Sequence, residues 1–191
     1  MNISIDAKDW SNIWLATKNS SPNCFAVETN YKVLTRWYLV PARIAKFAPA
    51  YSPNCFRGCD APGTHFHIWW QCPVVKEFWS SIFRMASKAL VKNISPDPAT
   101  ALLNLKPATL TNTRFQLLIH LSTAAKQTIA KAWKAKTLIV AEAKHRMNRS
   151  LIHAKMSAID NNKINNFHKI WQPWVKHLLP TDFDQSLLSP N

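Results

Sequence analysis

Three of the four cysteines in this 191-residue chain lie in one short stretch, CFRGCDAPGTHFHIWWQC, together with two histidines. The clustered cysteines are Cys55, Cys59 and Cys72, and Cys24 stands apart. Thiolate and imidazole groups are the usual ligands of structural zinc, with a few residues between paired ligands. The N-terminal MNISIDAKDW lacks the apolar region of a secretory signal, so we expect an intracellular protein with reduced thiols. Metal binding is therefore favoured over a disulfide framework.

Either of two histidines, His65 or His67, can complete a set of four ligands. Paired ligands at the C-terminal end of such sites are typically separated by three to five residues, which fits His67 and not His65. In a continuous helix His65 and Cys72 would lie about 10 Å apart along the axis. His67 and Cys72 are one residue beyond ideal helical facing, so we expect the helix to start between them or to be distorted there, with His67 in the entering turn. The predicted site is one structural zinc ion bound by Cys55, Cys59, His67 and Cys72.

The predicted site is not catalytic. Three thiolates and one imidazole fill a tetrahedral shell and leave no position for a reacting water. Asp60 is the only acid in the loop, and the chain's two glycines exclude glycine-rich phosphate loops. No serine has a nucleophile-elbow context, so we predict that the protein is not an enzyme. The alternative for the cluster is a group of buried cysteines around an aromatic core.

Helices are the elements expected to position this site. Apolar residues recur at helical spacing through most of the chain, and no convincing alternating strand pattern occurs. The predicted fold is mainly α, a helical domain with an embedded small CCHC zinc knuckle, and we expect the nine tryptophans to pack in its core. Helices are expected over residues 5–17, over 28–47 with a bend near 40 and 41, over 73–91, from 98, over 114–136, over 137–159 either continuous with the preceding helix or separate from it, and over 161–180.

The chain divides into five segments by composition. A proline- and threonine-rich connector separates the cysteine-rich part from the most basic part of the chain. The expected segments are an N-terminal helical segment (1–50), the zinc knuckle and following helix (51–93), the connector (94–113), a basic helical region (114–178) and a flexible tail (179–191).

Positive charge dominates the sequence. Lysine and arginine number 24 against 10 acids, giving a net charge of +14, and residues 114–155 hold nine of the basic residues against the single acid Glu142. Such a surface gains free energy by displacing counterions from a phosphate backbone. We expect contacts to nucleic acid from Arg57 of the knuckle and from Arg114, Lys126, Lys131, Lys134, Lys136, Lys144, Arg146 and Arg149. The alternatives are an ordinary solvated helix face or a surface for an acidic protein partner.

Aromatic residues beside the predicted metal can stack on unpaired bases, a contact that tolerates any sequence. Phe56 and Phe66 flank ligands in a loop too small to bury every side chain, so we expect them to serve as stacking residues.

The cysteine-rich stretch also resembles a known family. C-F-R-G-C, P-G-T and H-I-W-W-Q-C-P, followed by F-W, are similar to the C-terminal cysteine-rich region of the second-reading-frame proteins of vertebrate LINE-type non-LTR retrotransposons. That family has the pattern C-x3-C-x7-H-x4-C with a double tryptophan, so the resemblance independently selects His67. It continues through YKVLTRWYLVPARIAKFAP, PDPATALL, TIAKAWK and IWQPW, over residues 10–175.

The resemblance implies a nucleic-acid-binding region that lies beside a reverse transcriptase in the full element. The chain lacks the aspartate pair of a reverse transcriptase and any endonuclease segment, so neither activity is expected, and it departs from the family over 136–150. The expected partners are RNA or single-stranded DNA, bound without sequence preference, and the reverse transcriptase portion of the element. No membrane association is expected, and the location is the nucleus or a cytoplasmic ribonucleoprotein. The alternatives are a zinc-stabilised interaction module and a non-functional relic.

Overall fold

The computed structural model describes residues 5–178, which fold into helices joined by loops. No strand forms within that range, and an isolated bridge joins Asn54 to Pro62. The prediction of a mainly α fold is confirmed, whereas the predicted tail lies outside the described residues. The elements are α1 (Ala7–Lys18), α2 (Cys24–Leu34), α3 (Pro41–Ile44), η1 (His67–Gln71), α4 (Pro73–Leu90), α5 (Pro98–Leu103), α6 (Asn112–Lys131), α7 (Val140–Asp160) and α8 (Ile164–Leu178). Among these helices, none is both long and apolar enough to cross a membrane.

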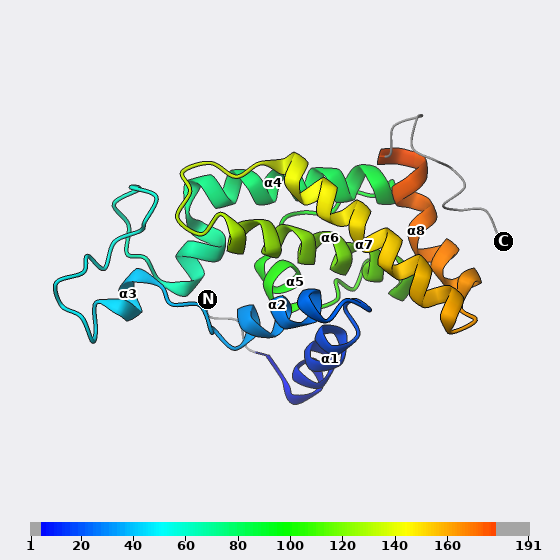
Figure 1. Ribbon diagram of the computed structural model, residues 1–191, viewed down its shortest axis with the longest axis horizontal. Coiled ribbons are helices and arrows are strands. Elements are labelled where there is room, and N and C mark those ends of the chain that lie inside the picture. The colour runs from blue at the N-terminus through cyan, green and yellow to red at the C-terminus, as the bar shows by residue number, and fades with distance from the viewer. Residues whose placement is uncertain (1–4, 179–191) are drawn as a thin grey trace.

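Helix α6 lies at the centre of the helical body, with α4 and α7 on one side and α2 and α5 on the other (Figure 1). Every side chain from Leu117 to Lys126 is buried. A helix at the surface of a protein buries only one side of its circumference. Helix α6 therefore builds the core, and the prediction of a basic surface over residues 114–155 is wrong for most of this helix.

Four helices begin where the sequence supplies a capping side chain. The side chains of Asp6, Asn23, Asp97 and Thr111 each accept a hydrogen bond from a backbone N–H in the first turn of α1, α2, α5 and α6. Such a bond satisfies one of the donors that a helix leaves without an internal partner. Proline stands at the start of α3, α4 and α5, where its missing N–H costs nothing. These local signals explain why the predicted starts of α4 and α5 are correct.

Two of the predicted helical stretches are interrupted. Helix α2 ends at Leu34, and a non-helical link precedes the single turn of α3, so residues 28–47 are not two helices meeting at a bend. Arg36 in this link has a φ of 55°, which a continuing helix does not allow. Residues 132–139 separate α6 from α7. The two long helices are therefore distinct and pack against each other.

The tryptophans divide between the core and the surface. Trp69, Trp79, Trp171 and Trp174 are fully buried, and Trp70 and Trp133 pack against the core from its edge. The indole N–H of Trp79 donates to the carbonyl of Trp69 at 2.9 Å, which joins α4 to η1. The prediction of burial is wrong for three tryptophans, all from the first part of the chain: Trp10, Trp14 and Trp37. Helix α1 packs against α2 at the edge of the molecule, so its tryptophans have little structure to cover them.

Candidate metal centre

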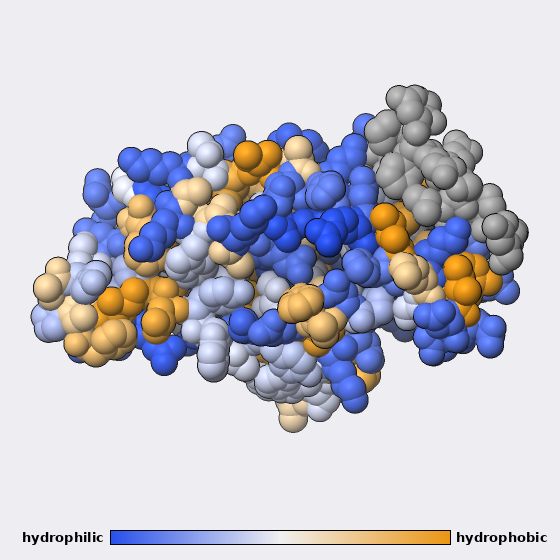
Figure 2. Space-filling view, viewed as in Figure 1, coloured by the Kyte–Doolittle hydropathy of each residue, from blue (hydrophilic) through white to orange (hydrophobic). Residues whose placement is uncertain are grey.

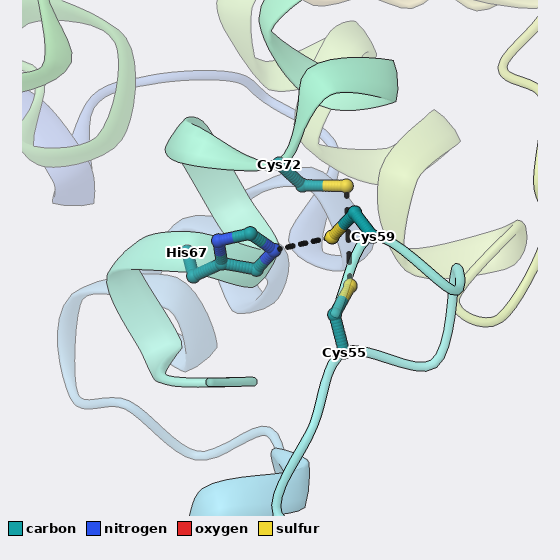
Figure 3. Close-up of side chains that lie close together, drawn as sticks. All are labelled: Cys55, Cys59, His67 and Cys72. Carbon is teal, nitrogen blue, oxygen red and sulfur yellow. Dashed lines mark hydrogen bonds between the residues drawn. The ribbon is translucent and has the colours of Figure 1, made fainter. Parts of the chain in front are cut away.

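The three clustered cysteines and His67 converge on one point (Figure 3). Their ligand atoms all lie within 4.8 Å of one another. Sγ of Cys55 lies 3.9 Å from Sγ of Cys72, and Sγ of Cys59 lies 3.1 Å from Nε2 of His67. Two thiolates on a tetrahedral metal, with metal–sulfur bonds of about 2.3 Å, lie about 3.8 Å apart. The cluster can therefore hold one metal ion with little movement.

A π-helical turn brings two of the ligands to the same side. In η1 the N–H of Cys72 donates to the carbonyl of His67 at 2.8 Å, an i→i+5 bond that widens the helix by one residue. This spacing places the side chains of His67 and Cys72 on the same side of the turn, whereas residues five apart in an ordinary α-helix lie on different sides. The predicted distortion between the two ligands is confirmed. The placement of His67 in the entering turn is wrong, because His67 is the first residue of η1.

The other two ligands come from a tight loop that begins at Cys55. The N–H of Cys55 bonds to the carbonyl of Ala61, and that of Gly58 bonds to the carbonyl of Cys55. Gly58 has a φ of 76°, a conformation that glycine adopts without strain, and it turns the chain so that Cys59 faces the cluster. Gly63 closes the loop against α3, where a Cβ would lie 2.6 Å from Pro41.

His65 is outside the ligand cluster, as the spacing predicts. Its ring centroid lies 6.1 Å from that of Trp69, and it lines a groove of about 740 Å³ together with Trp10 and Phe66. Burial, with a smaller contribution from the charge of Arg36, lowers the pKa of His65 to about 4. His65 is therefore a neutral side chain that packs between the knuckle and the N-terminal helices.

Burial favours the neutral forms of two ligand groups, the Cys55 thiol and the His67 imidazole. Burial is the main cause that raises the pKa of the Cys55 thiol to about 11. Burial and then the charge of Arg57 lower the pKa of His67, which favours the neutral imidazole that a metal requires. A metal ion held by Cys55, Cys59, His67 and Cys72 would displace the thiol protons and supply the positive charge that stabilises the thiolates.

Arg57, predicted to contact nucleic acid, is instead buried in the protein and only 5% exposed. Its guanidinium donates to three backbone carbonyls, those of Ile68 in η1 at 3.3 Å and of Trp133 and Ala135 after α6 at 3.1 Å each. The predicted role is wrong because these carbonyls use its donors on the inside of the protein. Arg57 thereby joins the loop that carries Cys55 and Cys59, the metal loop, to the link between α6 and α7. It also satisfies carbonyls of that link, which have no helical hydrogen-bond partner.

Lys126, also predicted to bind phosphate, has no exposed surface. Its Nζ donates to Oδ1 of Asn104 at 2.9 Å, and Nδ2 of Asn104 donates to Oγ1 of Thr17 at 3.2 Å. Burial lowers the pKa of Lys126 to about 7. The prediction is wrong because α6 is surrounded by other helices. One signal in the sequence points to this burial: FQLLIHLSTAA, immediately before Lys126, carries no formally charged residue.

The other predicted basic contacts lie at or near the surface. Arg114, Lys131, Lys134, Lys136 and Arg149 are exposed, whereas Lys144 and Arg146 are half-buried. One oxygen of Glu142 binds both Lys131, at 3.2 Å, and Arg146, at 2.8 Å. Figure 2 shows mostly hydrophilic side chains over the first half of α7 and hydrophobic ones toward its C-terminal end, where Ile152, Met156 and Ile159 are exposed.

The two predicted stacking residues are half-buried, and other aromatic residues are more exposed. Phe56 lies 6.5 Å from Trp133 between ring centroids, with Nζ of Lys134 5.2 Å from its centroid, and Phe66 packs against the core. Trp37, Phe47 and Tyr51, from the segment before the knuckle, are all more than 60% exposed. Helical spacing placed Trp37 in the predicted core, and no pattern in the sequence singled out Phe47 or Tyr51 as exposed rings.

No protein-family model matches the chain.

Proposed function

We propose that this chain is a non-catalytic nucleic-acid-binding region of a LINE-type retrotransposon protein. In this proposal a structural zinc ion holds the knuckle, and basic surfaces beside it bind RNA or single-stranded DNA without sequence preference. The observation that carries the proposal is the convergence of four buried or half-buried sulfur and nitrogen ligands on one point. Arg57, from the same loop, binds carbonyls of the basic link after α6 and so connects this cluster to it. The likeness of the cysteine-rich stretch to LINE-type sequences supplies the biological setting.

The donor set supports zinc as the metal. Three sulfurs and one imidazole nitrogen in a compact, closed arrangement are typical of structural zinc sites, and harder ions prefer oxygen ligands. Cys55, His67 and Cys72 are buried, and Cys59 is half-buried. The ion would hold the loop in place and take no part in chemistry.

The basic surface closest to the metal loop is the link after α6. Lys131, Lys134 and Lys136 are exposed on either side of the carbonyls that Arg57 binds. A zinc-held loop would therefore fix the backbone that carries these lysines. Fixed cationic groups contact phosphates with less loss of conformational entropy than flexible ones.

A second part of the surface combines charge with exposed rings. Trp37, Phe47 and Tyr51 lie close in sequence to Arg36, Arg43 and Lys46, and all except Tyr51 lie between residues 36 and 47. Proteins that bind single strands use aromatic side chains as stacking surfaces within a positively charged groove. This segment is therefore a better candidate for base stacking than Phe56 and Phe66.

The test is binding of zinc-loaded protein to a labelled mixed-sequence RNA and to its DNA counterpart, followed by fluorescence anisotropy at several salt concentrations. The logarithm of affinity is expected to fall with the logarithm of salt by about 0.7 per phosphate contacted. Reversing the charges of Lys131, Lys134 and Lys136 together is expected to weaken binding, with reversal of Lys8, Lys18 and Lys88 as the matched control. Lys126 is left unchanged because a buried carboxylate would unfold α6.

Wild-type protein that takes up zinc and binds neither RNA nor DNA would overturn the proposal. That result would favour the second candidate, an interaction module whose zinc and tryptophans form a scaffold. The specific observation behind this candidate is the exposed aromatic segment that includes Trp37 and Phe47. The natural partner of the region, in either case, would be the reverse transcriptase portion of the element, in the nucleus or a cytoplasmic ribonucleoprotein.

A further inference from the structure

A small polar cavity lies between α6, α7 and the start of α2. Its volume is about 160 Å³, and none of the four metal ligands lines it. Pockets for complete small molecules are typically about 300–1,000 Å³. A cavity of this size holds roughly five waters at about 30 Å³ each, which suits a single compact group.

Helix α7 presents a row of donors to this cavity. Arg146, Arg149, Ser150 and His153 all line it and follow one another at i, i+3, i+4 and i+7. Residues at this spacing share one side of a helix. The opposite wall is α6, which contributes Gln127 among other residues. The cavity therefore concentrates N–H and O–H groups from two packed helices.

The charge of the cavity is positive. No carboxylate lines it. Glu142 binds Nη2 of Arg146, but Nε of Arg146 is buried and has no hydrogen-bond partner within the described residues. In residues 5–178 no carboxylate forms an ion pair with Arg149, which is exposed. Two arginines with unused donors favour an anion with several acceptor oxygens.

His120 of α6 contributes a neutral group and no charge. Its Nδ1 lies 3.0 Å from Oγ of Ser150, and burial lowers the pKa of His120 to about 4. The ring packs on Trp171, with centroids 4.7 Å apart. The positive charge at neutral pH therefore comes mainly from the arginines, while His120 and Ser150 fix the wall between α6 and α7.

An aromatic side chain lies at the mouth of the cavity. Phe25 lines it and is 70% exposed. Asn23, the N-cap residue of α2, lines it too, and its Oδ1 accepts a hydrogen bond from the Phe25 N–H at 2.9 Å. A base can stack on an exposed ring of this kind while its phosphate lies beside it.

We propose that this cavity binds one phosphate group between Arg146 and Arg149, with the adjoining base stacked on Phe25. This inference deepens the proposed function and rests on it for the source of the phosphate, a nucleic-acid backbone. Inorganic phosphate or a free nucleotide would offer the same chemistry, so the experiment separates these sources.

The first arm of the test measures the phosphate site alone. Zinc-loaded protein with labelled arginine side chains is titrated with inorganic phosphate at constant ionic strength, and the Nε–Hε signals are followed by NMR. The signals of Arg146 and Arg149 are expected to shift and saturate. Arg149→Gln should weaken this binding about tenfold, whereas the matched control Arg84→Gln, an exposed arginine of α4, should not.

The second arm measures binding of a short mixed-sequence RNA, with AMP as the free-nucleotide probe. Arg149→Gln is expected to lower the salt slope for RNA by about 0.7, the loss of one phosphate contact on a single strand. Phe25→Ala should weaken RNA binding about tenfold and leave the phosphate shifts unchanged. Circular dichroism confirms that each variant is folded, as expected for exposed positions.

The outcomes separate the two proposals. Saturable phosphate shifts together with the altered RNA slope support the site and its nucleic-acid source. Phosphate and AMP binding without RNA binding support the site but contradict the proposed function. Absence of saturable shifts, or equal effects of Arg149→Gln and Arg84→Gln, overturns the site even where wild-type protein binds RNA.

Discussion

The metal cluster and the surroundings of Lys126 both place polar groups in an otherwise apolar core, and they satisfy those groups in different ways. The cluster gathers four ligands from within one stretch of the chain, where a metal ion can replace their protons. Lys126 has only neutral partners, Asn104 and through it Thr17, and has no counter-charge in its hydrogen-bond network. Burial of an ammonium group without a counter-charge disfavours the charged form. A bound metal ion can therefore satisfy the cluster, whereas the charge of the Lys126 network depends on pH.

Removal of a metal ligand should produce the largest effect. His67→Ala is expected to abolish stoichiometric zinc binding, measured by elemental analysis of purified protein, because one of four ligands is lost. Loss of about 4 kcal/mol would lower the melting midpoint by roughly 10 °C in a protein of this size. His65→Ala is the matched control and should retain one equivalent of zinc. Equal loss of zinc in both variants would show that the ligand assignment is wrong.

Arg57 is a second buried cation, and it donates to three carbonyls where Lys126 donates to one side-chain amide. Arg57→Leu removes donors from Ile68, Trp133 and Ala135, and buried carbonyls without donors are costly. We expect the free energy of unfolding in urea to fall by about 3 kcal/mol.

The matched control for Arg57 is Arg43→Leu. Arg43 is exposed and makes one bond to a carbonyl, that of Arg36 at 3.3 Å, so the expected change is within about 0.5 kcal/mol. A similar change in both variants would contradict the buried role of Arg57.

Lys126 should make the smallest but most specific contribution, a dependence of stability on pH. Its pKa is about 7 in the folded protein against the ordinary 10.5, so between these values the unfolded state binds more protons. Stability therefore rises with pH in this range, by about 1.4 kcal/mol per pH unit above pH 7.

Lys126→Met removes this contribution. We expect unfolding in urea at pH 7 to 9 to show a steep rise in stability for wild type and a flatter profile for the variant. Parallel profiles for the two proteins would show that Lys126 keeps an ordinary pKa.

The features that could be predicted from the sequence are those set by neighbouring residues. The metal ligands lie in one short stretch, and Pro73 and Pro98 mark the starts of α4 and α5, so spacing alone was sufficient. The distorted turn between His67 and Cys72 followed from their separation by one residue more than a helical turn.

The features that were missed depend on distant parts of the chain. The partners of Arg57 after α6 are 76 and 78 residues away, and Asn104 is 22 residues from Lys126. A count of positive residues cannot distinguish a buried cation from an exposed one, because burial depends on which helices surround it. For the same reason Trp37 was assigned to the core, although α3 and the adjoining loops leave it at the surface.

Arg57 has a thermodynamic consequence for the whole molecule. The same guanidinium contacts η1, which carries His67, and the link that carries Lys134 and Lys136. Coupling between two binding sites is reciprocal. If a ligand bound at this link changes the affinity of the cluster for metal by some factor, the metal changes the affinity of the link for that ligand by the same factor. A metal ion at the cluster and an anion at the basic link would therefore be thermodynamically coupled through a single side chain, that of Arg57.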